Sequence, residues 1–427
     1  MSARNRELLN LVVVGILTGL GFASVYIAQQ ELLSTVSLTY AGYFLGLYLA
    51  AHVIARLTVP NADPYLLPMV GLLTAVGLTE IYRLEPDDAF RQGGWIVVGV
   101  ALFGATLLLL RHNYRRLESY KYVLGVTAVG LLVLPVLPVL GQTVNGARLW
   151  IDLGPIQFQP GELAKIMLIV FLAGYLRDKR EVLAQGRLKD FGPLLLIWGL
   201  AMLVLVVTSD LGSALLYFGI FLAMIYVATA RVAYVAAGLG LFVAGAAAAY
   251  ELIPRVEERV SIWLDPWQDP HRSGYQLVQS LYSISNGGFG GTGLGKGTFA
   301  TTGGDPLIPY ANTDFIYSAL AQELGLVGSA GLLLVYMLFV TRGFRIALLA
   351  DDGFSKLLAA GLTFTFALQT FIIVGGIVRL IPLTGITLPF VSYGGSSIVS
   401  NFILLALLLL VSNRASASAR SAGNLDR

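Results

Sequence analysis

The chain has 427 residues, of which 56% are hydrophobic and only 12% are charged, whereas a soluble globular domain carries roughly 25% charged residues. This composition excludes an ordinary soluble globule and indicates a protein that crosses a membrane several times. The absence of Cys excludes disulfides and thiolate ligands, the three scattered His residues argue against a His-rich metal site, and the net charge of +3 gives no reason to expect nucleic-acid binding.

The apolar residues fall in blocks of about 20, the length that an α-helix needs to cross the hydrocarbon core. The first block follows Arg4 and Arg6, which resemble the start of a signal peptide, but no small-residue cleavage site follows, so we interpret it as a retained anchor. The sequence therefore predicts an all-α, polytopic membrane helix bundle of about twelve transmembrane helices. They are expected at residues 10–28, 37–56, 66–83, 94–110, 122–139, 161–176, 192–208, 211–229, 232–252, 314–341, 354–378 and 396–413.

The distribution of positive charge supports this number of helices. With the N-terminus inside the cell, most of the 28 Lys and Arg residues fall in predicted cytoplasmic segments, as the positive-inside rule requires. An even number of helices then places both termini in the cytoplasm. We divide the chain into an N-terminal two-helix addition at 1–60, a membrane core at 61–413 with a large outer loop at 254–313, and a disordered cytoplasmic tail at 414–427.

Three segments on the predicted outer side combine polar and helix-breaking residues with a fairly apolar background. They are Gly141–Gly161, the long loop Pro254–Thr313, and Arg379–Ser397. Non-helical backbone at membrane depth is tolerated only against protein or a water-filled cavity. We therefore expect the three segments to converge over one outward-facing cleft.

Ionisable side chains at bilayer depth are costly and are functional candidates. Glu162 and Lys165 are three residues apart on a predicted helix, so they share a face and can pair. The pair is either a buried structural salt bridge or part of a cleft that meets a charged substrate. Asp210 precedes a predicted helix and fits an N-cap. Arg148, beside Trp150, fits either an interfacial anchor or a group that binds diphosphate.

The long outer loop ends in NTDFIYSALAQELGLVG, in which Asp314 opens a predicted helix and Glu323 follows it. Thr313 and Asp314 are either a simple capping pair or, over a polar cleft, the place of a general base that acts on a hydroxyl. Earlier in the loop, Asp269 precedes a proline and is typical of a turn. The GxxxxGK pattern at Gly290–Lys296 is not a P-loop, because Gly follows it in place of Ser or Thr and no strand precedes it.

Five ordered motifs resemble those of the shape, elongation, division and sporulation (SEDS) family, whose members include RodA and FtsW. They are NGARLWIDLG with FQPGELAKI; DLGSAL; DPWQDP with GYQLVQSL and GGFGGTGLGKG; NTDFIYSALAQELGLVG; and IPLTGITLPFVSYGGSS. The resemblance runs from about Tyr65 to the last helix. It implies a ten-helix core, preceded here by two extra helices, that polymerises lipid II into β-1,4 glycan strands at the outer face of the bacterial plasma membrane. Lipid II is an undecaprenyl-diphosphate-linked disaccharide-pentapeptide.

Carried over residue by residue, the resemblance places the family's catalytic aspartate at Asp314. The substrate-binding candidates are Arg148, Glu162, Lys165, Asp210 and Arg379. Further loop candidates in the same motifs are Asp269, Tyr275, Gln279, Glu323 and Ser392. The sequence departs from the family pattern at Gly161 (usually Ser), Ser209 (Pro), Tyr310 (Glu), Asn312 (His) and Thr384 (Lys in many division members).

In the reaction that the resemblance implies, the acceptor's 4-hydroxyl loses a proton as it displaces a diphosphate with inversion. Asp314 would take that proton, while Arg148, Lys165 or Arg379, or a divalent cation such as Mg²⁺ or Mn²⁺, would offset charge on the diphosphate. No other cofactor is evident. Because the outer loop is too short to hold a transpeptidase domain, the crosslinking enzyme is expected to be another chain. The resemblance implies that this partner is a class B penicillin-binding protein with one membrane helix.

Two other functions also fit an outward-facing cleft. A lipid II flippase would use intramembrane charges too, but it predicts inverted repeats, and none is visible in the sequence. A noncatalytic scaffold of the cell-wall synthesis complex would need no carboxylate in the cleft. Within the polymerase interpretation, Thr384 and the twelve-helix layout favour a role in cell-shape elongation over division or sporulation.

Overall fold

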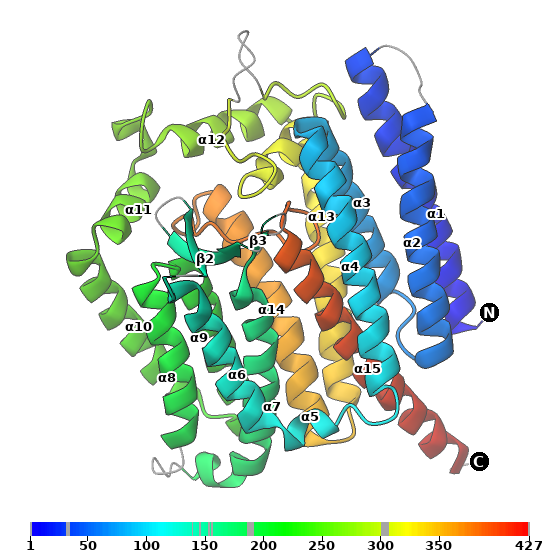
Figure 1. The fold of residues 1–427 in the computed structure, drawn as a ribbon, viewed down its shortest axis with the longest axis vertical. Coiled ribbons are helices and arrows are strands. Elements are labelled where there is room, and N and C mark those ends of the chain that lie inside the picture. The colour runs from blue at the N-terminus through cyan, green and yellow to red at the C-terminus, as the bar shows by residue number, and fades with distance from the viewer. Residues whose placement is uncertain are drawn as a thin grey trace.

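The computed structural model describes residues 2–30, 35–138, 140–144, 147–152, 154, 157–185, 192–299 and 307–425, and its helices run side by side as a bundle (Figure 1). The first six predicted spans correspond to α1 (Ala3–Gln30), α2 (Thr35–Thr58), α3 (Leu66–Leu84), α4 (Pro86–Leu110), α6 (Lys121–Val133) and α7 (Pro160–Ala184). The other six correspond to α8 (Gly192–Val207), α9 (Leu211–Thr229), α10 (Val232–Leu252), α13 (Ile316–Leu349), α14 (Gly353–Ile377) and α15 (Gly395–Leu425).

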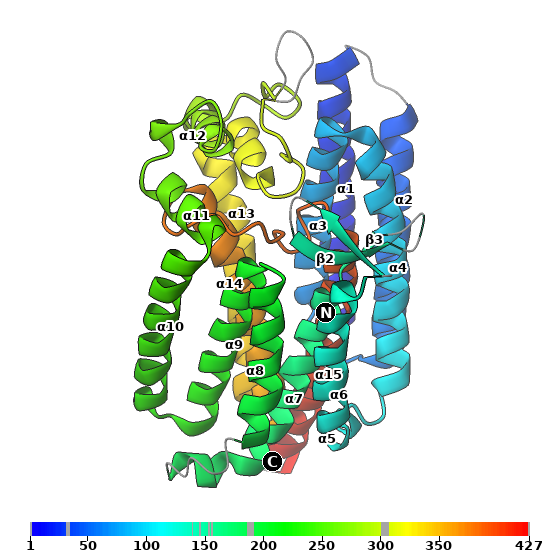
Figure 2. The same cartoon turned by 60° about the vertical axis from the view of Figure 1, so that its left-hand side comes forward.

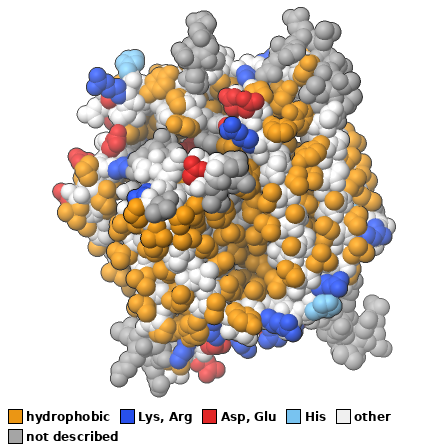
Figure 3. All heavy atoms as spheres, in the orientation of Figure 1, with side chains coloured by type: hydrophobic (Ala, Val, Ile, Leu, Met, Phe, Trp, Pro, Cys, Tyr) orange, Lys and Arg blue, Asp and Glu red, His pale blue; other side chains and the backbone are white. Residues whose placement is uncertain are grey.

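The fold is that of a multi-pass membrane protein. In the described part of the chain, nine helices are long and apolar enough to cross a membrane, namely α1 to α4, α9, α10, α13, α14 and α15, and α6 and α8 are shorter apolar helices. The remaining helix, α7, ends in the charged sequence RDKRE before its last three residues. Figure 3 shows an apolar band between two ends that carry charged side chains. The predicted polytopic helix bundle is confirmed.

The last helix, α15, is enclosed by the others. Every residue from Leu404 to Val411 is at most 3% exposed, as expected of a helix that is apolar on all sides. Its Phe402 packs closely on α4 at Gly99, where a Cβ would lie only 2.4 Å from the phenylalanine ring. By contrast, α10 buries only Gly238 among its residues. The apolar surface of α10 therefore faces the membrane.

The N-terminal pair α1 and α2 packs against α3. Phe22 of α1 stacks on Tyr40 of α2 with ring centroids 5.4 Å apart, and both rings contact Tyr82 of α3. Near the other end of the pair, buried Glu7 of α1 bonds to His52 Nδ1 of α2 at 2.7 Å. Both ends of the pair are thus held by specific contacts.

Three local features differ from the sequence expectation. The short helix α5 (Arg116–Ser119) precedes α6, and η1 (Leu134–Val136) follows it. The next segment forms a small antiparallel sheet of β1 (Gly141–Val144), β2 (Ala147–Asp152) and β3 (Gln157–Phe158), in the order β1-β2-β3. The long outer loop contains α11 (Pro254–Leu264), η3 (Pro266–Gln268) and α12 (Tyr275–Gly287). Residues 414–425 are helical within α15, so the prediction of a disordered tail is wrong there. Extending an existing Ala-rich helix needs no new nucleation.

Candidate functional site

The three segments that were expected to converge meet at one end of the bundle (Figures 1 and 2). Gln159, at the end of the first segment, donates its backbone N–H to Ser396 Oγ in the third at 2.8 Å. Arg259, in the second segment, donates from Nη1 to the carbonyl of Thr384 in the third at 3.1 Å. The third segment therefore connects the other two, and its fold decides what the site contains.

Asp314 lies at this end of the bundle, two residues before α13. The N-cap of α13 is Phe315, without a side-chain capping bond, and the Thr313 hydroxyl donates instead to the Tyr310 carbonyl at 3.1 Å. The interpretation of Thr313 and Asp314 as a capping pair is therefore wrong. The Asp314 carboxylate forms no hydrogen bond or ion pair with any residue that the structure describes. It is available for a ligand.

The environment of Asp314 suits a group that exchanges protons near neutral pH. Burial raises the pKa of Asp314 to about 6, and the positive charge of Arg259 opposes that rise. A carboxylic acid with this pKa is mostly ionised at pH 7 and is a stronger base than an exposed aspartate. Matching the pKa of a base to the working pH favours general base catalysis.

A set of hydrogen bonds fixes the backbone just before Asp314. Ser392 Oγ donates to the carbonyl of Thr313 at 2.6 Å, and the Tyr393 N–H donates to the carbonyl of Asn312 at 2.9 Å. Asn312 in turn donates from Nδ2 to Asp88 of α4 at 2.7 Å. Ser392, a loop candidate from the sequence, thus positions Asp314 through the backbone.

Glu162 and Lys165 form the predicted pair. Lys165 Nζ is 2.8 Å from Glu162 Oε2 and donates a second bond to Gln369 Oε1 at 2.9 Å, and the lysine is only 2% exposed. Glu162 Oε2 also accepts from Ser400 of α15 at 2.9 Å. Gln369 continues the network by donating to the carbonyl of Thr387 at 2.8 Å, in the segment that passes Asp314. The pair therefore supports the wall of the site.

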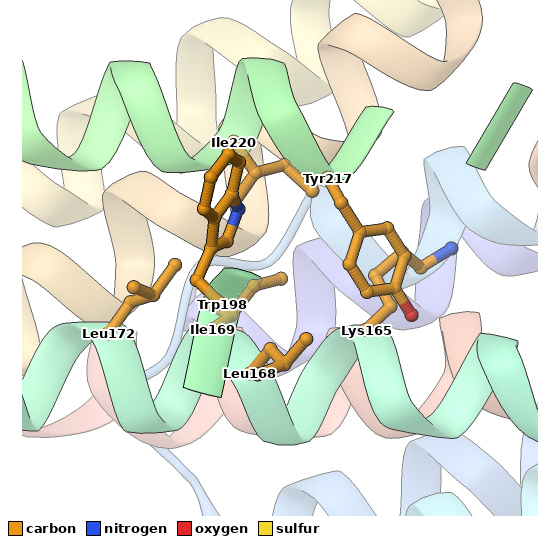
Figure 4. Close-up of a pocket in the computed structure, with 7 residues that line it drawn as sticks. All are labelled: Lys165, Leu168, Ile169, Leu172, Trp198, Tyr217 and Ile220. Carbon is orange, nitrogen blue, oxygen red and sulfur yellow. The ribbon is translucent and has the colours of Figure 1, made fainter. Parts of the chain in front are cut away.

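An apolar crevice lies next to this pair, between α7, α8 and α9. Figure 4 shows Lys165 and Tyr217 at one end of it and Leu172 at the other, with the indole of Trp198 between. The Tyr217 hydroxyl donates to the carbonyl of Gly161 at 2.7 Å, beside Glu162. The crevice thus leads from the charged pair into the apolar part of the bundle.

Asp210 and Arg148 border a second, small pocket. Asp210 Oδ1 accepts the N–H of Ser213 at 3.0 Å, which confirms the predicted N-cap, and burial raises the pKa of Asp210 above its usual value. Arg148 Nη2 donates to the carbonyls of Leu137 and Gly141, each at 3.2 Å. Arg148 thereby holds the turn into the sheet. The polar lining of the pocket also includes Gln159 and Thr208.

The guanidinium of Arg379 is occupied by the outer loop. It donates to the carbonyl of Trp263 from Nε and Nη2, at 3.2 and 3.0 Å, and to the carbonyl of Leu264 from Nη2 at 2.9 Å. The guanidinium also lies over the ring of Trp267, 5.1 Å from its centroid. Arg379 thus holds the C-terminal end of α11.

Three other loop candidates are not brought to Asp314 by any contact that the structure describes. Asp269 is partly buried, and its Oδ2 accepts from the Ser273 hydroxyl at 3.3 Å, as a turn residue does. Tyr275 and Gln279 lie on α12 and are partly buried.

Glu323 binds the Gly-rich part of the outer loop through its carboxylate. The carboxylate accepts the N–H groups of Gly295 and Gly297 at 2.7 and 3.0 Å, and Arg83 Nε lies 3.1 Å from its Oε1. Gly295 has a φ of +82° and packs on α1 near Val25, so a side chain there would be both strained and crowded. The Gly-rich loop therefore binds an internal carboxylate, which agrees with its exclusion as a P-loop.

The structure adds Arg259 to the site, which sequence reasoning missed. The sequence places it on an outer loop as one of several basic residues. The only signal was the amphipathic character of Pro254–Leu264, which turns one face of α11 toward the bundle. As for metals, the described residues contain no group of three or more Asp, Glu or His side chains that could hold an ion. The divalent cation, Mg²⁺ or Mn²⁺, stays a prediction.

Comparisons with known proteins give a consistent result. Residues 61–417 match the FtsW, RodA and SpoVE family, described as cell cycle protein. The chain is 41% identical to the peptidoglycan glycosyltransferase RodA of Mycobacterium tuberculosis, over 96% of this chain and 91% of the relative. It is similar to a solved chain of a peptidoglycan synthase complex that coordinates polymerization and crosslinking, with a TM-score of 0.69, 30% identity, and coverage of 83% of this chain and 98% of that one. The crystal structure of the rod shape determining protein RodA of Thermus thermophilus gives a TM-score of 0.61 and 29% identity, over 83% and 97%.

Proposed function

Because this chain belongs to the FtsW, RodA and SpoVE family, we propose that it is a peptidoglycan glycosyltransferase that polymerises lipid II and uses Asp314 as the general base. One observation carries the assignment of the base. Asp314 is an ionisable carboxylate without a partner among the described residues, at the place where the three outer segments meet, and its pKa is raised to about 6.

The chemistry requires one base and compensation for one leaving group. The acceptor's 4-hydroxyl oxygen attacks the anomeric carbon of the donor sugar, and its proton passes to an Asp314 carboxylate oxygen. The bond from the anomeric carbon to the diphosphate oxygen breaks. The diphosphate oxygen takes the bonding electron pair, and the diphosphate leaves still attached to its lipid carrier. Attack from the opposite face converts an α-linkage into a β-1,4 linkage. A site among membrane helices lets the polyprenyl tail remain in the bilayer.

The same proposal fixes the orientation. The end with α11, α12 and the sheet faces outward, and both termini lie in the cytoplasm. The short helix α5 lies at the opposite end (Figure 1), and the basic residues in it and next to it, Arg115, Arg116 and Lys121, support this orientation through the positive-inside rule. Thr384 and the twelve-helix layout support a role in cell-shape elongation.

The direct test is incubation of the purified protein and its cognate transpeptidase with labelled lipid II. We expect a ladder of glycan strands, visible on a gel once the transpeptidase is blocked by a β-lactam. A protein that moved lipid II across vesicles without forming strands would be a flippase. The absence of both activities would leave only a scaffold, and either outcome would reject the proposal.

We also propose that the partner is a class B penicillin-binding protein whose single helix packs on α13. Among the late helices α15 is enclosed, whereas α13 presents Leu334 and Met337 at 55% and 65% exposure. The partner's outer domain would rest on the α11–α12 region, which is connected to Asp314 through Arg259 and the third segment. Contact there would adjust the site, which makes polymerisation dependent on the partner.

Cysteine crosslinking tests this interface, because the chain has no native Cys. Cys at Leu334 or Met337, paired with Cys in the partner's helix, is expected to form a crosslinked complex. Cys at Leu203 or Val207 of α8, which are exposed at 58% and 67% on another helix, serves as the matched control. Equal crosslinking at both helices, or full polymerisation by the isolated chain, would contradict the proposal.

A further inference from the structure

The negative charge of the departing diphosphate needs a cation to offset it. The three side-chain cations expected from the sequence already form other contacts. Lys165 is bound to Glu162 and Gln369, and Arg379 to the carbonyls at the end of α11. Arg148 Nη2 is bound to two backbone carbonyls in the turn before the sheet. A substrate would have to displace these bonds before it could use the same donors. Arg148 Nε has no partner among the described residues, but it is buried in that turn, and no contact in the described part of the chain links Arg148 to Asp314.

Arg259 is placed differently. Its Nη1 donates to the Thr384 carbonyl at 3.1 Å, and the guanidinium forms no ion pair within 4 Å in the described part of the chain. The charged groups that act on it are Asp210, Asp314, Glu258 and the neighbouring Arg255. Burial lowers the pKa of Arg259, which means that its charge is poorly compensated where it stands. An anion at this position would compensate it.

Gly385 leaves space between Arg259 and Asp314. A Cβ built on Gly385 would lie 4.0 Å from Arg259 Nη2 and 3.6 Å from Asp314 Oδ2. The two side chains therefore approach the same backbone position, and the space that a side chain at 385 would take is called the notch below. With a φ of +74°, position 385 is also one where other residues are strained, so glycine keeps the notch open. The notch joins a cation and the proposed base at one point.

We propose that Arg259 binds an anionic oxygen of the donor's diphosphate at this notch. The donor sugar that carries this diphosphate is attacked by the acceptor's 4-hydroxyl, which Asp314 deprotonates. Nη1 anchors the guanidinium on Thr384, and Nη2 and Nε remain to form charge-assisted bonds to phosphate oxygens. This inference rests on the proposed function, since it supplies the cation for that reaction. It also gives α11 a direct part in substrate binding.

Binding of undecaprenyl diphosphate tests the inference without turnover. In an inactive Asp314→Asn background in nanodiscs, adding Arg259→Gln is expected to raise the Kd for undecaprenyl diphosphate at least tenfold. Arg255→Gln, one turn away on the same helix, is the matched control and should change Kd by less than twofold. Undecaprenol, which lacks phosphate, should bind all three proteins equally, because a damaged fold would weaken both lipids. Arg259→Lys should give an intermediate Kd, and it replaces Arg259→Gln if that variant does not fold.

An Arg259→Gln protein that binds undecaprenyl diphosphate within twofold of its parent would overturn the inference. So would an equal loss of affinity for undecaprenol, because the effect would then be structural. Neither result bears on Asp314 as the base. Conversely, polymerisation by the Asp314→Asn protein would reject the proposed base whatever the binding data show.

Discussion

Replacing Asp314 with Asn is expected to lower lipid II polymerisation by at least about 100-fold, the lower range of what a general base contributes. The amide keeps the shape of the side chain but cannot accept the acceptor's proton. Because Asp314 has no partner among the described residues, the change should leave folding and membrane insertion intact. Glycan ladders measure the activity, and thermal melting in detergent measures the fold.

Asp269→Asn is the matched control for this substitution. It makes the same chemical change at a turn residue of the outer loop, whose carboxylate bonds to Ser273 and not to any described residue of the site, and should leave polymerisation unchanged. Near-normal activity of the Asp314→Asn protein, with loss in the Asp269→Asn protein, would move the base to Asp269.

The pH dependence of polymerisation gives a second readout of the same residue. The base must be ionised, and its folded-state pKa is raised to about 6. Activity should therefore be highest above pH 7 and fall as the pH is lowered through about 6, approaching tenfold per pH unit below that point. An acidic limb near pH 4, typical of an exposed carboxylate, would contradict the described environment of Asp314.

The second large effect is expected at the Glu162–Lys165 pair. Changing either residue alone, as Glu162→Gln or Lys165→Met, leaves one buried charge without its partner, which typically costs about 3–5 kcal/mol. The double change removes both charges and should cost less than either single change. Melting temperatures and polymerisation rates of the four proteins form a double-mutant cycle that measures this coupling.

The surface pair Lys121–Asp178 is the control for this cycle. Asp178 is 43% exposed, so water solvates its charge when Lys121 is replaced, and Lys121 at 13% exposure is still more accessible than Lys165 at 2%. Its coupling should be about 0–1 kcal/mol, as for other surface salt bridges. If the losses at Glu162 and Lys165 were also additive, the two residues would not interact in the folded protein, contrary to their 2.8 Å contact.

Several features of this protein follow from the sequence by itself. A membrane helix must satisfy its own backbone hydrogen bonds and be mainly apolar, so each of the twelve predicted spans overlaps a helix. The Glu162–Lys165 pair and the N-cap at Asp210 depend only on helical spacing within one element, and both are present. The family motifs likewise identified Asp314 as the candidate base, and the family itself is confirmed.

What lies around Asp314 was decided by tertiary structure alone. Position 259 faces the base only because α11 packs on the third outer segment, and Ser392 reaches Thr313 only because that segment folds back over α13. The sequence suggested Arg379 as a cation for the diphosphate, yet its guanidinium donates to backbone carbonyls at the end of α11. Local spacing determines helices and pairs within one helix. Contacts between distant segments depend on loop paths that satisfy buried carbonyls and charges, and no local pattern specifies those paths.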